Sequence, residues 1–281
     1  NTSTSGSISF AAKVDFATNS GSLGIAIGDV DGDGKPDLAV TRFSEGAGTV
    51  VSVLRNTSTS GAISFAAKAD FTVGVGPIGV ALGDLDGDGK AELVVSNYGT
   101  FAGDGATVSV LRNTSTSGSI SFATKADFAT NSGPRGVVIG DVDGDGKADV
   151  LVANFGNSSG STVSVLRNTG TTGNLAFAAK VDLTVGSGAL GIALRDLNKD
   201  GKADIAVSNF SSGTLSLLQN NSTSGNVAFT AKFDFASGAN AFEPVISDLD
   251  GDSWPDVAVT AYGGGVNNTV AVLRNLLGTP H

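Results

Sequence analysis

The sequence predicts an all-β fold made of five copies of one structural unit. An acidic stretch recurs along the 281 residues, with starts that are 55, 57, 55 and 52 residues apart. A fixed period of this length indicates an array of one supersecondary unit. The residues between these stretches are mostly small or β-branched, and the chain has 40 glycines. This composition favours many short strands joined by tight turns, and no window shows a sustained helical period.

Each unit contains four predicted strands. In the first unit, residues 23–27 form a small, strongly apolar strand that leads into the acidic stretch. Further strands are predicted at 38–40, at 49–54 and at 63–71, and the last of these partly alternates apolar and polar residues, as an outer strand does. Four antiparallel strands in about 55 residues is the size of one propeller blade. We therefore predict a β-propeller of five four-stranded antiparallel blades, as a single domain over residues 1–281.

The two ends of the sequence predict how the ring closes. The chain begins with a predicted fourth strand at 8–16 and finishes after a predicted third strand at 269–274. We expect the N-terminal strand to pair into the last blade, which would close the ring and remove two exposed sheet edges. The alternative is that these five repeats are an excerpt from a longer ring, cut at a repeat boundary.

The nine-residue acidic stretches have the residue types of calcium sites; we call them acidic loops one to five (29–37, 84–92, 141–149, 196–204 and 248–256). Ca²⁺ takes about six to eight oxygen ligands, and each loop offers side chains at positions 1, 3, 5 and 9 and a carbonyl at position 7. Glycines at positions 4 and 6 let the backbone curl around an ion at positive φ. The predicted ligands are Asp29, Asp31, Asp33, Asp37 and the Lys35 carbonyl in loop one; Asp84, Asp86, Asp88, Glu92 and the Lys90 carbonyl in loop two; Asp141, Asp143, Asp145, Asp149 and the Lys147 carbonyl in loop three; Asp196, Asn198, Asp200, Asp204 and the Lys202 carbonyl in loop four; and Asp248, Asp250, Asp252, Asp256 and the Trp254 carbonyl in loop five.

Two of the loops depart from the pattern. Loop four has Asn198 in place of an aspartate and Lys199 in place of a glycine, and loop five has Ser253 in place of a glycine. Affinity for calcium falls with fewer charged ligands and with poorer loop geometry. We therefore expect up to five structural Ca²⁺ ions, bound more tightly in loops one to three than in loops four and five.

The charge of the chain follows from these loops. Its formal net charge is −10, and 19 of its 27 acidic residues lie in the five loops. Five divalent cations would balance this charge, whereas a generally acidic surface would not explain the clustering. The negative charge argues against nucleic-acid binding, and without an apolar run of about 18 residues we expect no membrane span.

The motif at residues 28–40, Gly-Asp-Val-Asp-Gly-Asp-Gly-Lys-Pro-Asp-Leu-Ala-Val, resembles the FG-GAP/VCBS repeat, the integrin-α-type calcium β-propeller blade. The match extends to residues 49–55 and to the phenylalanine-containing fourth strand, and all five units show it. The resemblance implies a propeller fold and calcium binding. Family members include integrin heads, lectin-like and adhesive bacterial proteins, and non-catalytic parts of enzymes. Rings in this family more often have seven blades, so the count of five departs from the family pattern.

The sequence offers little that could carry out catalysis. The one histidine is His281 at the end of the chain, there is no cysteine, and no Gly-x-Ser-x-Gly elbow stands beside a histidine. The clustered carboxylates lie mainly in the acidic loops, where a metal would occupy them. On this checklist we expect that the protein is not an enzyme.

A possible ligand-binding face lies opposite the acidic loops. The connections from second to third strands vary most, and loops on a rigid scaffold commonly carry binding. One interpretation is a ring of aromatic and amide groups for a sugar or a peptide; the other is that the aromatic residues pack between blades and the asparagines cap strand ends. The candidates are Arg42, Phe43, Asn97, Tyr98, Phe101, Asn154, Phe155, Asn209, Phe210 and Tyr262.

The sequence thus favours an extracellular, calcium-stabilised recognition or adhesion module without catalytic activity. Calcium sites of the extracellular type suggest a secreted or cell-surface location. The expected partner is a carbohydrate or an extracellular protein. Two alternatives stay open: a structural subunit of a surface assembly or filament that forms by self-assembly, and a non-catalytic propeller part of a larger secreted enzyme.

Overall fold

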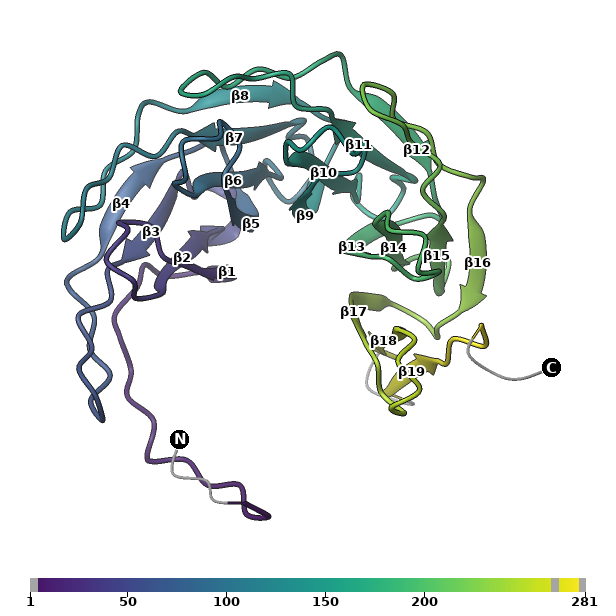
Figure 1. The fold of residues 1–281 in the computed structure, drawn as a ribbon, viewed down its shortest axis with the longest axis horizontal. Helices are drawn as coiled ribbons and strands as arrows, with labels where there is room; N and C mark the ends of the chain where they lie inside the picture. Colours follow the sequence, from purple (N-terminus) through teal and green to yellow (C-terminus); the bar gives the residue numbers. More distant parts are fainter. Residues whose placement is uncertain (1–4, 264–267, 278–281) are drawn as a thin grey trace.

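The structure, a computed structural model, describes residues 5–263 and 268–277, and its strands form five antiparallel sheets along an arc (Figure 1). In every sheet the strands lie side by side in sequence order, with the first strand at the inside of the arc. We call the sheets blades one to five. Blade one holds β1 (Ser22–Gly28), β2 (Asp37–Arg42), β3 (Val50–Leu54) and β4 (Ala69–Thr72); blade two β5 (Pro77–Gly83), β6 (Glu92–Asn97), β7 (Thr107–Leu111) and β8 (Ala126–Ala129); blade three β9 (Pro134–Gly140), β10 (Asp149–Asn154), β11 (Thr162–Leu166) and β12 (Val181–Thr184); blade four β13 (Ala189–Arg195), β14 (Asp204–Asn209), β15 (Thr214–Leu218) and β16 (Phe233–Ala236); and blade five β17 (Ala241–Ser247), β18 (Asp256–Ala261) and β19 (Thr269–Leu273).

The predicted all-β architecture of five antiparallel blades is confirmed. One short 3-10 helix, η1 (Ser44–Gly46), follows β2. The outer strands are shorter than predicted, because residues before β4 instead form a hairpin with bridges between Asn56 and Phe65 and between Thr59 and Ala62. Over the described parts of the chain, no helix has the length and the apolar character that a membrane crossing requires.

The hydrophobic core lies between neighbouring blades. Ala39, Val51 and Val53 of blade one are buried against Leu93 and Val95 of blade two, and the next two boundaries repeat this pattern. Each sheet therefore has apolar residues on both faces. Burial of this apolar area between sheets is the main contribution to holding the blades together.

Glycines in the innermost strands let the blades approach closely at the inside of the arc. A Cβ atom on Gly24 would lie 2.2 Å from the carbonyl oxygen of Ile78, and one on Gly79 would lie 2.1 Å from that of Arg135. These distances are far below van der Waals contact, so only glycine fits. The small, apolar inner strand predicted from the sequence has this steric reason.

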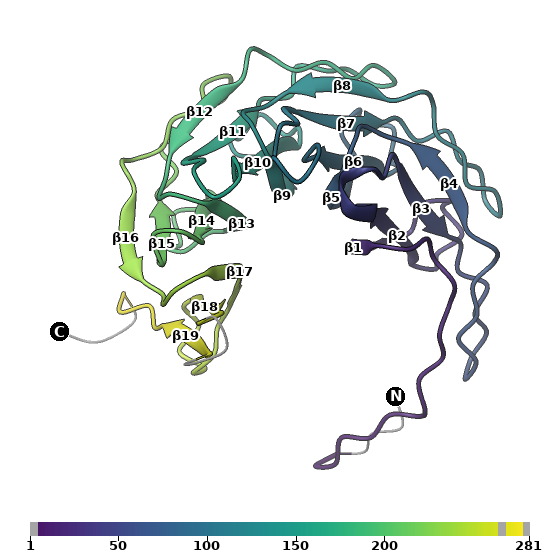
Figure 2. The same cartoon turned by 180° about the vertical axis from the view of Figure 1, so that it is seen from behind.

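The ring closure predicted from the sequence is not formed. Blade five has three strands, and the segment 8–16, which we expected to be its fourth, is in no strand. Figures 1 and 2 show this segment extending from blade one, while blade five lies at the other end of the arc. The packing of each blade on the next sets the curvature, and that curvature leaves the first and fifth blades apart.

Candidate metal centres

The five acidic loops each join the first and second strands of a blade. In four of them, oxygen atoms of three carboxylates lie within 4.8 Å of one another. Among the described residues, loop four does not form such a group. The groups are Asp29, Asp31 and Asp33; Asp84, Asp86 and Glu92; Asp141, Asp143 and Asp149; and Asp248, Asp250 and Asp256.

The first aspartate of each loop organises the backbone. The Asp29 carboxylate accepts hydrogen bonds from the amides of Gly32 and Gly34, both at 2.8 Å. These glycines have φ values of +72° and +84°, a region that favours glycine. The loop therefore curls around the carboxylates as predicted.

The ninth residue of each loop ties three segments together. One oxygen of Asp37 accepts the amide of Val30 at 2.9 Å, and the other accepts the amide of Asn56, at the end of β3, at 2.7 Å. Asp37 is fully buried, and the residues at this position in the other loops are at most 3% exposed. The sequence predicted this residue as a ligand but did not predict its anchoring role.

Burial raises the pKa of the ninth carboxylate in loops one to four. Burial raises the pKa of Glu92 to about 7 and the pKa of Asp149 to about 6, and two backbone hydrogen bonds on each oppose that rise. Neighbouring carboxylates, such as Asp86 and Asp88 beside Glu92, raise the pKa further. A cation among these oxygens would favour their ionised forms.

The donor set fits a hard cation such as calcium. Oδ2 of Asp86 is buried and has no hydrogen-bond partner among the described residues, which leaves it available to a metal. The loop lysine does not neutralise the carboxylates here, because Nζ of Lys90 donates to the Ser115 carbonyl at 2.9 Å. Converging carboxylate oxygens are the ligand type that calcium takes.

Loops four and five differ from the others in the way the sequence suggested. Lys199 and Ser253 occupy glycine positions and keep positive φ values of +60° and +70°. In loop five, Arg274 forms ion pairs with Asp250 and, at 3.3 Å, with Asp252. This guanidinium would compete with a metal for the same oxygens, more closely than Arg167, whose Nη1 lies 3.8 Å from Oδ2 of Asp143 in loop three.

Each of the first four loops is also held by the blade that follows it. The side-chain amide of Asn113 donates to the carbonyl of Val30 at 2.8 Å, and the amide of Gly118 donates to Oδ2 of Asp31 at 3.0 Å. Sequence reasoning missed these asparagines, although each one recurs directly after an arginine or glutamine at the end of a third strand. The equivalent bonds run from Asn168 to Leu85 at 2.6 Å, from Asn220 to Val142 at 2.9 Å and from Asn275 to Leu197 at 2.8 Å.

Most of the predicted ligand-face residues are engaged in packing. Asn97, Asn154 and Asn209 are buried, and their amides donate to hydroxyl groups on the adjacent strand, as from Asn97 to Ser109 at 3.0 Å. Tyr98 and Phe155 are each 6% exposed. They belong to a row of ring contacts that runs from Phe43 through Tyr98, Phe155 and Phe210 to Phe242.

Only part of the predicted ligand face is accessible. Phe101 and Tyr262 are 65% and 52% exposed, while Arg42, Phe43 and Phe210 are half-buried. Phe101 lies edge-on to Phe43, with ring centroids 5.3 Å apart. The structure thus assigns the asparagines and the inner aromatic residues to packing, and it leaves Phe101 and Tyr262 as the exposed aromatic groups of this face.

A family model described as FG-GAP-like repeat matches the chain five times, over residues 1–40, 42–95, 100–152, 143–207 and 196–259. The chain belongs to the FG-GAP-like repeat family. The resemblance found in the sequence is therefore confirmed over nearly all of this FG-GAP-like chain. No curated protein matches it.

Three solved structures resemble the FG-GAP-like chain in fold. The V. cholerae biofilm matrix protein Bap1 has a TM-score of 0.51 and 19% identity, over 90% of this chain and 38% of Bap1. A protein from Lactobacillus plantarum has a TM-score of 0.50 and 16% identity, over 85% of this chain and 67% of that one. An Agrocybe aegerita lectin that recognises non-reducing terminal N-acetylglucosamine has a TM-score of 0.49 and 19% identity, over 90% of this chain and 66% of the lectin.

Proposed function

We propose that this FG-GAP-like chain is a calcium-stabilised recognition module without catalytic activity that acts outside the cell. The observation that supports it most is the convergence of carboxylates in the acidic loops, together with the buried and unpaired Oδ2 of Asp86. Calcium suits such a site better than magnesium, which keeps more of its water and takes fewer protein ligands.

The metal has a structural role in this proposal. The acidic loops contact the following blade through Asn113 and its equivalents, so a bound ion would stabilise the boundary between blades as well as the loop. Extracellular modules bind calcium at about 10⁻⁴ to 10⁻³ M, concentrations met outside cells. A secreted or cell-surface location follows, and it is in keeping with the biofilm matrix in which Bap1 is described.

Recognition would use the face opposite the acidic loops. The loop from β6 to β7 is held by Asp104, which accepts the backbone amide of Thr100 at 2.7 Å. It presents Phe101 on a rigid support, with one edge packed on Phe43 and most of the ring exposed. An exposed aromatic ring of this kind stacks on sugars or buries against an extracellular protein.

The proposed absence of catalysis rests on the roles of the titratable groups. The two carboxylates whose pKa is raised furthest, Glu92 and Asp149, belong to the acidic loops, where the metal would hold them. His281 lies outside the described residues. The described residues thus supply carboxylates that would hold a metal and an exposed surface that could contact a ligand.

The test is binding to an array of glycans and extracellular matrix proteins, in calcium and again in chelator. We expect calcium-dependent binding to one ligand class, reduced about tenfold by Phe101→Ala. Thr223→Ala, on the hairpin side of blade four, serves as a control that leaves the loop face intact. Binding that is equal in chelator, or silence from a protein shown to be folded, would contradict the proposal.

A further inference from the structure

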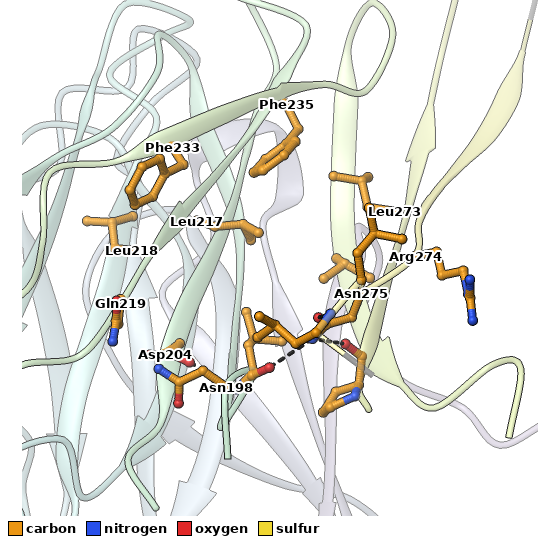
Figure 3. A pocket seen from close by; sticks show the side chains of 15 residues that line it. Asn198, Asp204, Leu217, Leu218, Gln219, Phe233, Phe235, Leu273, Arg274 and Asn275 are labelled. Atoms are coloured by element: carbon orange, nitrogen blue, oxygen red, sulfur yellow. Dashed lines mark hydrogen bonds between the residues drawn. The ribbon is translucent and has the colours of Figure 1, made fainter. Parts of the chain in front are cut away.

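An apolar pocket lies between blades four and five, where blade five lacks an outer strand. It has a volume of about 380 Å³. Figure 3 shows the rings of Phe233 and Phe235 projecting from β16 into it, with Leu217 and Leu273 nearby. Phe235 is 44% exposed there, which is unusual for a ring that faces a blade boundary.

At the other boundaries a phenylalanine from the next blade fills the equivalent space. Phe71 on β4 meets Phe122 edge-on at 4.9 Å, and Phe128 on β8 meets Phe177 at 4.7 Å. In each pair the second ring comes from the hairpin after the third strand of the following blade. Phe235 on β16 corresponds to Phe71 on β4, and the described part of blade five supplies no ring to meet it. The pocket therefore corresponds to the space that a phenylalanine ring fills at the other boundaries.

The segment 8–16 contains a phenylalanine at the sequence position that would fill this pocket. It differs from residues 63–71 at only one of nine positions, and Phe10 corresponds to Phe65, the equivalent of Phe122. The segment is in no strand, and Phe10 is 73% exposed. Its far end is fixed, because Phe16 packs edge-on against Phe65 of blade one with ring centroids 4.9 Å apart.

The outer edge of blade five is the matching strand edge. The third strands of the other blades each pair with an outer strand, whereas β19 pairs only with β18. In blade one, Val51 lies opposite Phe71 and Val53 opposite Ala69. The same register would place Phe16 opposite Val270 and Val14 opposite Val272. Val14, Val270 and Val272 are all exposed, so pairing would bury apolar surface as well as satisfy backbone groups.

We propose that residues 8–16 of a second copy of this chain complete blade five, with Phe10 in the pocket beside Phe235. A second copy is required because, within one copy, Figures 1 and 2 place the segment and β19 at opposite ends of the open arc. The contact joins the first blade of one copy to the fifth blade of another. Such a head-to-tail contact can repeat and so build chains or rings of copies.

Blade one of the second copy would then sit on blade five as blade two sits on blade one. Asn56 has an amide that bonds only to Pro36 within its blade, whereas Asn113 also reaches the preceding blade. The carbonyl of Leu249 in loop five would be its acceptor. One position opposes close packing, because Glu243 stands on β17 where the other inner strands have glycine. The contact between copies is therefore weaker than the contact between blades, and association depends on concentration.

Cross-linking between two differently tagged copies tests the proposal directly, since the chain contains no cysteine. One copy carries Phe10→Cys and the other carries Leu277→Cys, which lines the pocket. We expect a mixed disulfide that needs both variants. Phe101→Cys, at another largely exposed aromatic position, should not give it in place of Phe10→Cys. A single chain with both cysteines that cross-links only within itself would overturn the proposal in favour of closure in one copy.

A peptide of residues 8–16 provides the second measurement and does not depend on the fold of a variant. The labelled peptide is titrated against the full chain, and binding is followed by fluorescence anisotropy. We expect saturable binding that competes with self-association, at least about tenfold weaker for the peptide with Phe10→Ala. Equal binding of both peptides, or a chain that stays monomeric at every concentration and binds neither, would overturn the proposal.

Discussion

The side-chain amide of Asn113 crosses the boundary between the first two blades and donates to the backbone carbonyl of Val30, 2.8 Å away. Val30 is the second residue of an acidic loop, and its own amide is bound by Asp37 of the same loop. A single asparagine thus links the metal-type loop of one blade to the third strand of the next. The bond recurs at each later boundary, so loop geometry and blade packing are coupled along the arc.

Asn113→Ala should destabilise the protein more than Asn56→Ala does. Both substitutions remove a bond to a carbonyl of the same blade, Ala91 or Pro36, and a bond accepted from the amide two residues on. Only Asn113→Ala also removes a bond across the boundary. Because the Val30 carbonyl is left buried without its donor, we expect an extra loss of about 1 kcal/mol or more in the free energy of unfolding. Urea denaturation of both variants measures the difference, and equal losses would contradict the coupling.

Asp37→Ala and Asp33→Ala should separate the anchoring role from the metal-binding role, because in loop one Asp33 belongs to the group of converging carboxylates and Asp37 does not. Asp37 accepts the amides of Val30 and Asn56 in a buried place, so its loss should cost about 2 kcal/mol or more with and without calcium. Asp33 accepts only the amide of half-exposed Lys35, which water can replace. Its loss should lower stability in calcium and have little effect in chelator. Thermal unfolding of both variants under both conditions gives the comparison.

Ser253→Gly should stabilise the fold. Ser253 has a φ of +70°, and all four other loops have a glycine with positive φ at this position, among them Gly201 of loop four. Because a side chain in this region is strained, its removal should raise the free energy of unfolding by about 1 kcal/mol, measured in chelator. Ser159→Gly, at a residue without a positive φ, is the control and should not stabilise. A destabilised Ser253→Gly protein would show that the strain argument is wrong.

Gly79→Ala should be much more harmful than Gly83→Ala, although both lie on β5. A Cβ atom at Gly79 would meet the Arg135 carbonyl oxygen at 2.1 Å, whereas one at Gly83 would meet the flexible side chain of Ile139 at 2.9 Å. Since backbone cannot move aside as a side chain can, we expect a loss of about 3 kcal/mol for Gly79→Ala and about 1 kcal/mol for Gly83→Ala. Similar unfolding midpoints for the two variants would mean that the blades are free to separate.

The repeated parts of the structure could be predicted from the sequence. The fixed period, the glycines of the inner strands and the alternate aspartates each follow from local chemistry, so blades and acidic loops were predicted with their residues. The sequence could not show whether Tyr98 and Phe155 bind a ligand or pack between blades, because an aromatic residue at a strand end is consistent with both roles. Their burial in one row of rings settles this in favour of packing.

Long-range geometry was harder to predict than local structure. The segment 8–16 has an outer-strand sequence, and the sequence therefore predicted that it closes the ring. Whether it reaches blade five depends on the turn from each blade to the next, which small packing distances such as that between Gly24 and Ile78 determine. The role of Asn113 was missed for a similar reason, since its partner Val30 lies 83 residues away in sequence.

Metal ions in the acidic loops are proposed to stabilise the propeller. The most direct test of this stabilisation is the melting temperature of the full chain in millimolar calcium, in magnesium and in chelator. Since a site at about ten times its Kd contributes about 1.4 kcal/mol, several loops should together raise the melting temperature in calcium by roughly 10 °C over chelator. Magnesium should give a much smaller rise. A melting temperature that is the same in calcium and in chelator would contradict stabilisation by bound metal.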